Sequence, residues 1–430
     1  MSSWDSSQLM ERVANKENLR HAWKRVRSNK GSPGPDGITI EDTQASLEEV
    51  LDRLARALRD GRYRPGPVRK VEIPKANGGK RTLGIPNVID RLAQQAVLQQ
   101  LTPIFDPIFS NSSQGFRPGR SQHGALKEAL GHLRGGFVHV VNIDLAKFFD
   151  TVQHDVLMAR VARRVDDKSV LRLIGRFLRA GVMEGGLASP RIKGTPQGGP
   201  LSPLLSNILL DDLDKELEAR GHRFVRYADD FLVFKRRERS AQRTKTTVTR
   251  FLAKRLKLTV NETKSSVTTP NDLIYLGYAF YVTDDGIDLT ASEEAQKRLM
   301  AKLRAEFQRK GRGRSMKKTV DRLNRIVRGW FHYFRLGVNY LRFRRIDQWM
   351  RRRVRVLQLR FWGRSLRARR NGVRRLGGDV ALQQAVIGLR SGPWALGAHP
   401  TMQRLMPTAY IHNELGLFSL LKAWKNDGKR

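Results

Sequence analysis

The order of apolar and polar positions divides the chain into three stretches. Residues 1–60 are expected to form helices around a loop at residues 31–37, where Gly and Pro are too dense for a helix to continue. Residues 61–290 mix short β-rich runs with helices, and from about Ala291 onward the pattern is helical throughout. We therefore expect an α+β centre with helical regions on either side.

Within the centre, residues 138–143 and 224–234 are apolar and rich in β-formers. The first run predicts a strand, and the second predicts two strands of a hairpin with Asp229 and Asp230 at its tip. Residues 201–217 predict a helix, because their leucines and isoleucine share one face. In the later helical region, a spacing of three or four predicts a buried stripe made of Ile346, Met350, Val354, Leu357 and Phe361.

Charge narrows the choice of partner. Lys and Arg number 81 against 41 Asp and Glu, a formal net charge of +40. Such an excess destabilises a compact chain by self-repulsion unless a polyanion neutralises it, although a thermophilic or GC-biased source would also raise the Arg content. No apolar run approaches the roughly 18 residues that span a bilayer, and the first residues lack a signal-peptide pattern. We expect nucleic acid, and no membrane, as the partner.

The strongest concentration of charge lies in residues 342–375, which contain fourteen Arg and a single acid, Asp347. A solvated helix face usually mixes charges of both signs. One-signed charge interleaved with aromatic residues favours contact with nucleic acid. Beyond residue 377 the chain is less basic and Pro and Gly return, which indicates a small appended domain beginning near Ser365.

Carboxylates supply the candidate chemistry. Asp229 and Asp230 lie between two β-rich runs, and Asp144 ends the apolar run at residues 140–144. Adjacent carboxylates repel unless a cation lies between them, and Mg²⁺ is a hard ion that carboxylate oxygens bind. An exposed acidic turn and a helix-capping Asp are the alternatives for these positions. A two-metal site would need both segments to converge.

The order of motifs along nearly the whole chain resembles that of reverse transcriptases encoded by group II introns. Any one of these strings is weak, but seven in the expected order make a chance match negligible. The motifs are residues 31–37, 71–75 with 81–86 and Asp90-Arg91, 114–120, 194–203, 227–230, 261–264 and 275–278.

The resemblance implies an α+β right-hand polymerase with fingers, palm, a helical thumb and a small C-terminal DNA-binding domain. The expected units are an N-terminal extension with a template-lid loop (1–60), fingers and palm (61–290), a thumb or maturase domain (291–364) and the DNA-binding domain (365–430). In this family Asp144, Asp229 and Asp230 would be the catalytic carboxylates that hold two Mg²⁺ ions.

Residues for the incoming nucleotide follow from the same resemblance. Phe149 would lie under the sugar and exclude a 2′-hydroxyl by steric clash, although a core aromatic is the plain alternative. Basic side chains on either side of the turn at residues 76–79 would grip the triphosphate, unless they only solubilise a hairpin tip. Together the expected nucleotide contacts are Lys75, Arg81, Phe149, Gln197 and Lys264.

Arginines are the expected contacts to RNA and DNA backbones, because they bind phosphate oxygens. Two belong to the motif at residues 114–120 and the others to the thumb, where the neighbouring aromatic residues are expected to be helix core. The set is Arg117, Arg120, Arg328, Arg344, Arg345, Arg351, Arg352 and Arg355. The histidines at 132, 154 and 332 have no metal-ligand partners in view and are read as structural.

Cysteine is absent, which excludes disulfides, cysteine-ligated zinc and cysteine nucleophiles. Longer members of the family end in an endonuclease with paired cysteines, so this chain resembles the endonuclease-lacking, group IIC-like subgroup. The expected function is an RNA-directed DNA polymerase that binds its intron RNA, assists splicing and copies the RNA during retrohoming.

Two alternatives remain. One is a domesticated reverse transcriptase that acts in host DNA repair or defence without an intron. The other is a splicing-only maturase with an inactive polymerase, against which the intact acids argue. The expected partners are intron RNA, an RNA template–DNA primer duplex, target DNA and dNTPs, in a ribonucleoprotein that contains one copy of the chain or a homodimer. The bacterial cytoplasm is the expected location, with association to the nucleoid.

Overall fold

The structure is a computed structural model that describes residues 8–74, 79–184, 187–189, 193–194, 198–308, 315–337, 340–363, 365–388 and 392–427. The chain forms two compact units, Met1–Thr269 and Pro270–Arg430. The mixture of strands and helices confirms the predicted α+β class. The predicted division into four domains stays a prediction.

Helices open the first unit, as expected. Asn15 caps α2 by accepting hydrogen bonds from the backbone of Glu17 and Asn18, and Thr39 with Asp42 forms a capping box at α3. The helices are α1 (Leu9–Val13), α2 (Lys16–Ser28), α3 (Ile40–Ala45) and α4 (Leu47–Arg59). The loop at residues 31–37 lies between α2 and α3, and the backbone carbonyl of Ser32 accepts a 2.7 Å hydrogen bond from Arg91.

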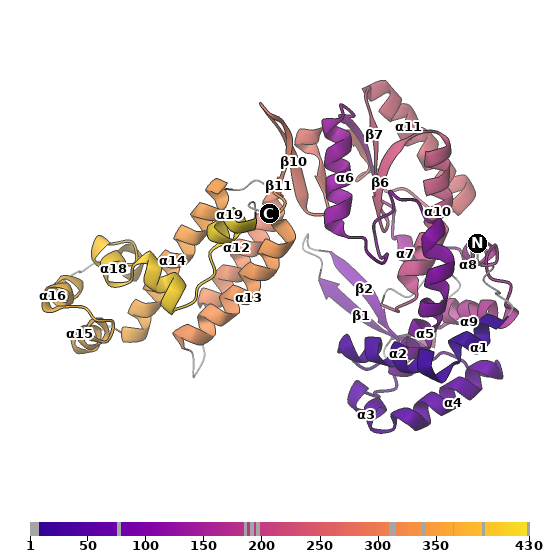
Figure 1. The fold of residues 1–430 in the computed structure, drawn as a ribbon, viewed down its shortest axis with the longest axis horizontal. Coiled ribbons are helices and arrows are strands. Elements are labelled where there is room, and N and C mark those ends of the chain that lie inside the picture. The colour runs from indigo at the N-terminus through magenta and orange to yellow at the C-terminus, as the bar shows by residue number, and fades with distance from the viewer. Residues whose placement is uncertain are drawn as a thin grey trace. The chain divides into compact units, whose positions relative to one another are not determined.

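Two sheets follow in the first unit (Figure 1). One has the order β2-β1-β4-β5 and the other β6-β7-β3-β8. The strands of the first are β1 (Val68–Pro74), β2 (Lys80–Ile85), β4 (Val182–Glu184) and β5 (Leu187–Ser189). Those of the second are β3 (His139–Ile143), β6 (Arg223–Tyr227), β7 (Asp230–Lys235) and β8 (Ser266–Thr268).

Helices pack against the second sheet and form most of the core around it. In the second sheet α11 packs against β3, β7 and β8, while α6 and α10 pack against β6. The helices are α5 (Val88–Phe105), α6 (Gln122–Arg134), α7 (Phe148–Thr151), α8 (His154–Val161), α9 (Lys168–Arg179), α10 (Ser202–Ala219) and α11 (Glu238–Phe251). The apolar face predicted at residues 201–217 is buried in the core of the unit.

The second unit begins with a small antiparallel sheet of order β11-β10-β9 and then is helical. Its strands are β9 (Ile274–Tyr275), β10 (Tyr278–Thr283) and β11 (Gly286–Ala291). Its helices are α12 (Glu293–Gln308), α13 (Met316–Phe334), α14 (Tyr340–Trp362), α15 (Leu366–Arg375), α16 (Val380–Gly388), α17 (Pro393–Leu396), α18 (Pro400–Leu405) and α19 (Leu420–Asp427).

The stripe predicted on α14 is buried at its first four members and wrong at its last. Phe361 is 39 % exposed, whereas Leu359 is buried. The helix ends at Trp362, and Gly363 turns the chain with a φ of 78°. The helical period therefore stops being a guide to burial at this end of the element.

Across the parts of the chain that the structure describes, no helix combines the length and the apolar character needed to cross a bilayer.

Candidate active site

The predicted carboxylate hairpin is formed by β6 and β7. Tyr227 pairs with Asp230, so Ala228 and Asp229 make a two-residue turn. Ala228 is buried and left-handed, with a φ of 59°. That conformation costs an L-residue on the order of 1–2 kcal/mol, so surrounding contacts have to hold it. The turn places the Asp229 side chain at the end of the hairpin.

The third carboxylate comes from the neighbouring strand. In the antiparallel pairing of β3 with β7, Ile143 lies opposite Phe231. One step further along the same register, Asp144 falls opposite Asp230, because consecutive pairs in an antiparallel ladder move in opposite directions along the two strands. The structure therefore brings Asp144, Asp229 and Asp230 to one edge of one sheet, formed by the ends of the central strands β3 and β7 and not by an outer strand.

The chemistry of these donors fits a divalent cation. Asp144 and Asp229 are half-buried and Asp230 is exposed, so all three carboxylates have access to solvent. Hard cations prefer such carboxylate oxygens. Among the described residues, no three acidic or histidine side chains are already gathered at ion-binding distance.

Lys264 lies beside this edge. Its Nζ is 3.4 Å from Oδ2 of Asp144. The Lys264 side chain is 55 % exposed and that of Asp144 35 % exposed, so solvent partly screens the pair. The backbone fixes this proximity: Asn261 N donates to the Asp144 carbonyl at 2.8 Å, and Asp144 N donates to Ser265 Oγ at 3.0 Å. The predicted nucleotide-binding lysine and the first of the predicted catalytic carboxylates are thus neighbours.

Phe149 stands on the short helix α7, directly after a left-handed turn at Lys147, whose φ is 47°. Its ring lies edge-on to Phe148 at 5.2 Å. Phe148 is only 2 % exposed, whereas Phe149 is partly open to solvent. The structure thereby separates the core ring from the ring that can meet a ligand.

The glycine-rich motif at residues 194–203 is held at both ends. Gly194 donates its N–H to the Val152 carbonyl at 2.8 Å, and a Cβ on Gly194 would lie 2.8 Å from the Phe149 carbonyl oxygen. A Cβ on Gly198 would lie 2.6 Å from the carbonyl oxygen of Gly84 in β2. Close approach therefore requires glycine at these two positions.

Three predicted nucleotide contacts are not located at the side-chain level. Lys75 and Gln197 lie outside the described residues. Arg81 is described only by its backbone in β2, where it pairs with Ile73 of β1. The prediction that two strands flank the turn at residues 76–79 is confirmed. The roles of the three side chains stay predictions.

Arg117 does not fit its predicted role at the nucleic-acid backbone. Its side chain is 6 % exposed and donates to Asp106 Oδ1 at 2.7 Å and to the carbonyls of Ser110 and Ser113. These protein acceptors leave it no open face for a phosphate. Arg120, in contrast, is partly exposed and donates to Asn111.

Arg120 lines a groove of about 1460 Å³ beside the hairpin, together with Lys24, Arg25, Phe116 and Tyr227. The rings of Phe116 and Tyr227 are 6.1 Å apart, and Phe116 is 53 % exposed. Cations next to an exposed aromatic ring form a surface suited to a nucleic-acid strand.

The arginines of the predicted thumb fall into three groups by exposure. Arg328, Arg344 and Arg345 are exposed, and Arg351 and Arg352 are half-buried. Arg352 stacks over Trp394 at 3.7 Å. Arg355 is buried and donates to the Met406 carbonyl at 3.0 Å, so its predicted contact with nucleic acid does not fit. Buried Asp347, the single acid of this stretch, caps α19.

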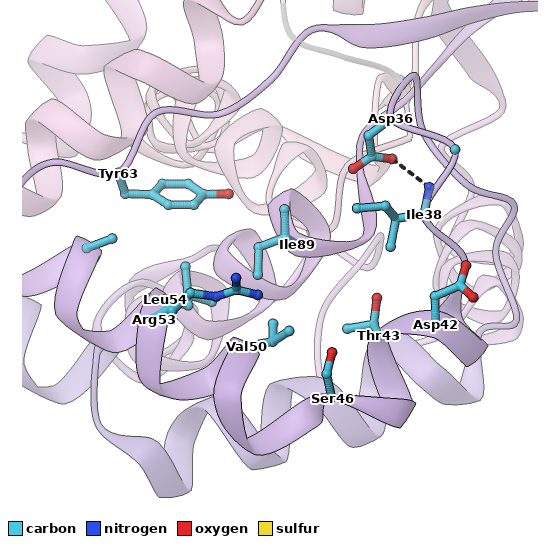
Figure 2. A pocket seen from close by; sticks show the side chains of 12 residues that line it. Asp36, Ile38, Asp42, Thr43, Ser46, Val50, Arg53, Leu54, Tyr63 and Ile89 are labelled. Atoms are coloured by element: carbon cyan, nitrogen blue, oxygen red, sulfur yellow. Dashed lines mark hydrogen bonds between the residues drawn. The ribbon is translucent and has the colours of Figure 1, made fainter.

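A cavity of about 650 Å³ lies in the N-terminal region, between α3, α4 and the segment after the loop at residues 31–37 (Figure 2). Tyr63 lines it and donates a 2.5 Å hydrogen bond to buried Asp90. Burial raises the pKa of Asp90 to about 6, against the lowering effect of the Tyr63 hydroxyl and the Gly66 N–H. Asp90 belongs to a predicted motif, and in the structure its carboxylate holds the Tyr63 hydroxyl and the Gly66 backbone in place.

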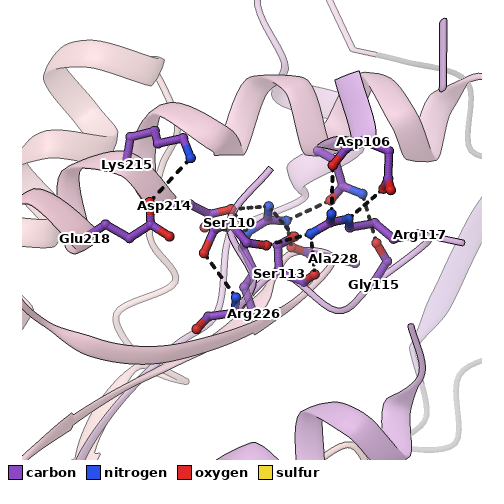
Figure 3. A network of polar contacts seen from close by, with 12 residues as sticks. Asp106, Ser110, Ser113, Gly115, Arg117, Asp214, Lys215, Glu218, Arg226 and Ala228 are labelled. Atoms are coloured by element: carbon purple, nitrogen blue, oxygen red, sulfur yellow. Dashed lines mark hydrogen bonds and ion pairs between the residues drawn. The ribbon is translucent and has the colours of Figure 1, made fainter. Parts of the chain in front are cut away.

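Sequence reasoning missed a buried polar cluster directly behind the hairpin turn (Figure 3). Arg226 and Asp214 are each wholly buried and form an ion pair. A signal was present, because an arginine interrupts the apolar run at residues 224–234. Its acidic partner could not be picked out among the five acids of residues 211–218 from spacing alone.

Family models match two parts of the chain. Residues 73–280 match the model described as "Reverse transcriptase (RNA-dependent DNA polymerase)". Residues 296–377 match the model described as "Group II intron, maturase-specific domain".

Curated relatives agree with these matches. "Protein YkfC" of Escherichia coli (strain K12) is 35% identical over an alignment of 313 residues that covers 63% of this chain and 82% of that protein. "Group II intron-encoded protein LtrA" of Lactococcus lactis subsp. cremoris is 40% identical over 195 residues, which are 45% of this chain and 32% of that protein. Among solved structures, a chain of a "Partial Cas6-RT-Cas1--Cas2 complex" is 25% identical with a TM-score of 0.37, covering 57% of this chain and 42% of that one. A likeness of that size carries no weight for fold or function.

Proposed function

The chain belongs to the group II intron reverse transcriptases, RNA-directed DNA polymerases, and from that premise we propose that it extends a DNA primer at the sheet edge of Asp144, Asp229 and Asp230. The observation that carries this proposal is the β3–β7 register, which sets Asp144 opposite Asp230 beside the turn that holds Asp229. Two separate segments converge there, as metal-dependent nucleotidyl transfer requires.

Reverse transcriptases use divalent metal ions, and we propose two Mg²⁺ ions held by these three carboxylates. When bound, such ions lower the pKa of a primer 3′-hydroxyl and neutralise charge on the phosphate under attack. The protein's part is to hold the carboxylates on a rigid edge. Lys264 keeps a positive charge 3.4 Å from Asp144, where it can turn to the triphosphate of an incoming dNTP.

The other nucleotide contacts are proposed around the same edge. Phe149 would lie under the sugar, and Lys75 and Arg81 would bind the triphosphate from the turn between β1 and β2. Gln197 would approach the nucleotide from the loop whose ends are packed against α7 and β2. This arrangement is supported by the close packing of Gly194 against α7, which carries Phe149, and of Gly198 against β2, which carries Arg81.

Nucleic acids are the substrates, and we propose specific paths for them. The groove beside Tyr227, with Arg120, would take the template strand, and the exposed thumb arginines would bind the template–primer duplex or folded RNA. The match of residues 296–377 to a maturase-specific domain supports intron RNA as a partner, with splicing and retrohoming as the setting. We also propose target DNA as a partner and a homodimer as one assembly in the ribonucleoprotein.

The test is primer extension on an RNA template with dNTPs and Mg²⁺. Asp229→Ala should lower the rate at least about a thousandfold, since a metal ligand contributes several kcal/mol to the transition state. Asp285→Ala is the matched control. It lies in the β10–β11 hairpin, where Asp284 and Asp285 are an exposed acidic pair in another two-residue turn. The control should extend primers like the wild type. Equal extension by both variants would refute the site.

A further inference from the structure

Arg226 is a charged side chain without any exposure to solvent, and it lies directly behind the catalytic turn (Figure 3). Its Nε is 2.8 Å from Asp214 Oδ1, and its Nη2 is 2.5 Å from Asp214 Oδ2. This is a two-pronged pairing of guanidinium with carboxylate, which is geometrically specific. Asp214 on α10 therefore neutralises the charge and fixes the plane of the guanidinium.

The remaining N–H groups of Arg226 reach three other parts of the unit. Nη1 donates to the Ala228 carbonyl at 2.9 Å and to Asn207 Oδ1 at 2.9 Å. Nη2 also donates to Ser113 Oγ at 2.8 Å. A simple counter-ion pair would need none of these bonds. One guanidinium thus joins α10, the segment at residues 112–115 and the hairpin turn.

The bond to Ala228 bears directly on the site. The carbonyl of Ala228 belongs to the peptide group that links it to Asp229, so holding this oxygen fixes the orientation of that peptide plane. Ala228 is in the left-handed region with a φ of 59°, a conformation that an alanine does not keep unless its surroundings impose it. The Cα of Asp229 lies in this peptide plane, so fixing the plane also fixes the direction in which the Asp229 side chain leaves the backbone.

The segment at residues 112–115 closes over the turn from the other side. Arg226 N donates to the Ser112 carbonyl at 2.9 Å, and Gln114 N donates to the Arg226 carbonyl at 2.8 Å. A Cβ on Gly115 would lie 2.3 Å from the Ala228 nitrogen. Asn207, which accepts from Arg226, also donates to the Gly115 carbonyl at 2.8 Å. Packing against Gly115 and hydrogen bonds that include those of Arg226 and Asn207 therefore help to hold the turn.

We propose that Arg226 is a positioning residue that, clamped by Asp214, Asn207 and Ser113, locks the Ala228–Asp229 peptide so that Asp229 faces the sheet edge it shares with Asp144. This role rests on the proposed function of that edge. Arg226 does not touch the substrate or the metal. It sets the affinity of the edge for divalent cations, and through it the rate of nucleotide addition.

The competing explanation is that the buried ion pair only stabilises the fold, and buried pairs are often replaceable in that role. The two explanations differ in what Arg226→Lys changes. Lysine keeps the positive charge beside Asp214 but has no planar fork to reach Ala228 and Asp214 together. A fold-only role loses stability alone, whereas a positioning role also weakens the metal site.

The experiment measures Mn²⁺ binding by electron paramagnetic resonance in a complex with an RNA template, a dideoxy-terminated DNA primer and the next dNTP. In this complex no turnover occurs. Arg226→Lys should bind Mn²⁺ about 10- to 100-fold more weakly, the usual effect of losing a group that orients a metal ligand. The Mg²⁺ concentration for half-maximal extension should rise in parallel, with template–primer affinity unchanged.

Arg160→Lys is the matched control. Arg160 on α8 is mostly buried and pairs at 2.9 Å with Asp212, which lies on α10 like Asp214. Its other hydrogen bonds are to the Val156 and Arg255 carbonyls, and neither of these residues belongs to the hairpin turn. It should lose thermal stability but keep wild-type Mn²⁺ binding. Wild-type Mn²⁺ binding in folded Arg226→Lys would overturn the positioning role.

Ser113→Ala keeps the result decisive if Arg226→Lys does not fold. It removes one neutral hydrogen bond and leaves the ion pair intact, so Mn²⁺ binding should weaken by up to about fivefold. Unchanged binding in this variant would then overturn the role. If the wild type binds Mn²⁺ but makes no DNA, the proposed function fails. The positioning role is then still tested by comparing Mn²⁺ binding of the wild type and of Arg226→Lys. An active wild type with unaltered Arg226→Lys refutes only the positioning role.

Discussion

At the scale of single residues, two adjacent rings on α7 differ in their exposure to solvent. Phe148 is buried in the core, while Phe149 keeps an exposed edge. We expect Phe149→Val to admit ribonucleotides, because a smaller side chain removes the clash with a 2′-hydroxyl. The ratio of kcat/KM for a ribonucleotide to that for its deoxynucleotide should rise about tenfold or more.

Phe148→Leu is the control for this selectivity. Shrinking a buried ring should cost stability, on the order of 1–3 kcal/mol, without changing the preference for deoxynucleotides. The two variants are compared by single-nucleotide extension and by urea unfolding. An unaltered ratio in Phe149→Val would mean that Phe149 is a core residue as well.

Asp90 makes the scaffold sensitive to pH. Its pKa is raised from 3.8 to about 6 in the folded protein, chiefly by burial. The folded state therefore binds the proton more tightly than the unfolded state, and stability falls as pH rises from about 4 to 6. Asp90→Asn removes this dependence. Because only the wild type loses stability as pH rises, the free energy of unfolding of Asp90→Asn minus that of the wild type should be about 1 kcal/mol larger at pH 7 than at pH 5.

Urea unfolding of both proteins at the two pH values measures this difference. The sign of this difference separates two explanations. If Asp90 instead formed a stabilising ion pair, Asp90→Asn would become less stable relative to the wild type as pH rises. Parallel stability profiles of variant and wild type would show that Asp90 does not titrate in this window.

At the scale of elements, the hairpin of β6 and β7, strand β3 and helix α10 were predictable because each has a local pattern. Two apolar runs on either side of a short acidic segment predict a hairpin, and one apolar face predicts a packed helix. The facing of Asp144 and Asp230 was not predictable this way. It depends on the pairing of β3 with β7, whose segments lie far apart in sequence, and only the family resemblance pointed to it.

Arginine burial was the main feature that sequence reasoning could not resolve. Arg117, Arg226 and Arg355 look like their exposed neighbours in composition. Their acceptors are Asp106, Asp214 and the Met406 carbonyl, and these belong to other elements. Whether an arginine faces solvent or a buried acceptor depends on packing between elements, which periodicity within one element does not encode.

For the whole molecule, the dominant physical quantity is the net charge of +40. Such a chain gains binding free energy by releasing cations from a nucleic acid, so its affinity has to fall as salt rises. The structure divides the arginines into those that can contribute and those that cannot. Arg344 and Arg345 on α14 are exposed, whereas Arg355 on the same helix is committed to the protein interior.

We therefore expect Arg344→Ala with Arg345→Ala to weaken RNA binding and to reduce the slope of log affinity against log salt by about 1–2. Arg355→Ala should leave that slope unchanged and instead lower the unfolding temperature, since it deletes a buried hydrogen bond and leaves the Met406 carbonyl unpaired. Fluorescence anisotropy with a structured RNA over a range of KCl concentrations measures the slope. A smaller slope for Arg355→Ala, with no change in the double variant, would reverse the assignment of inner and outer arginines and place the phosphate-binding face on the other side of α14.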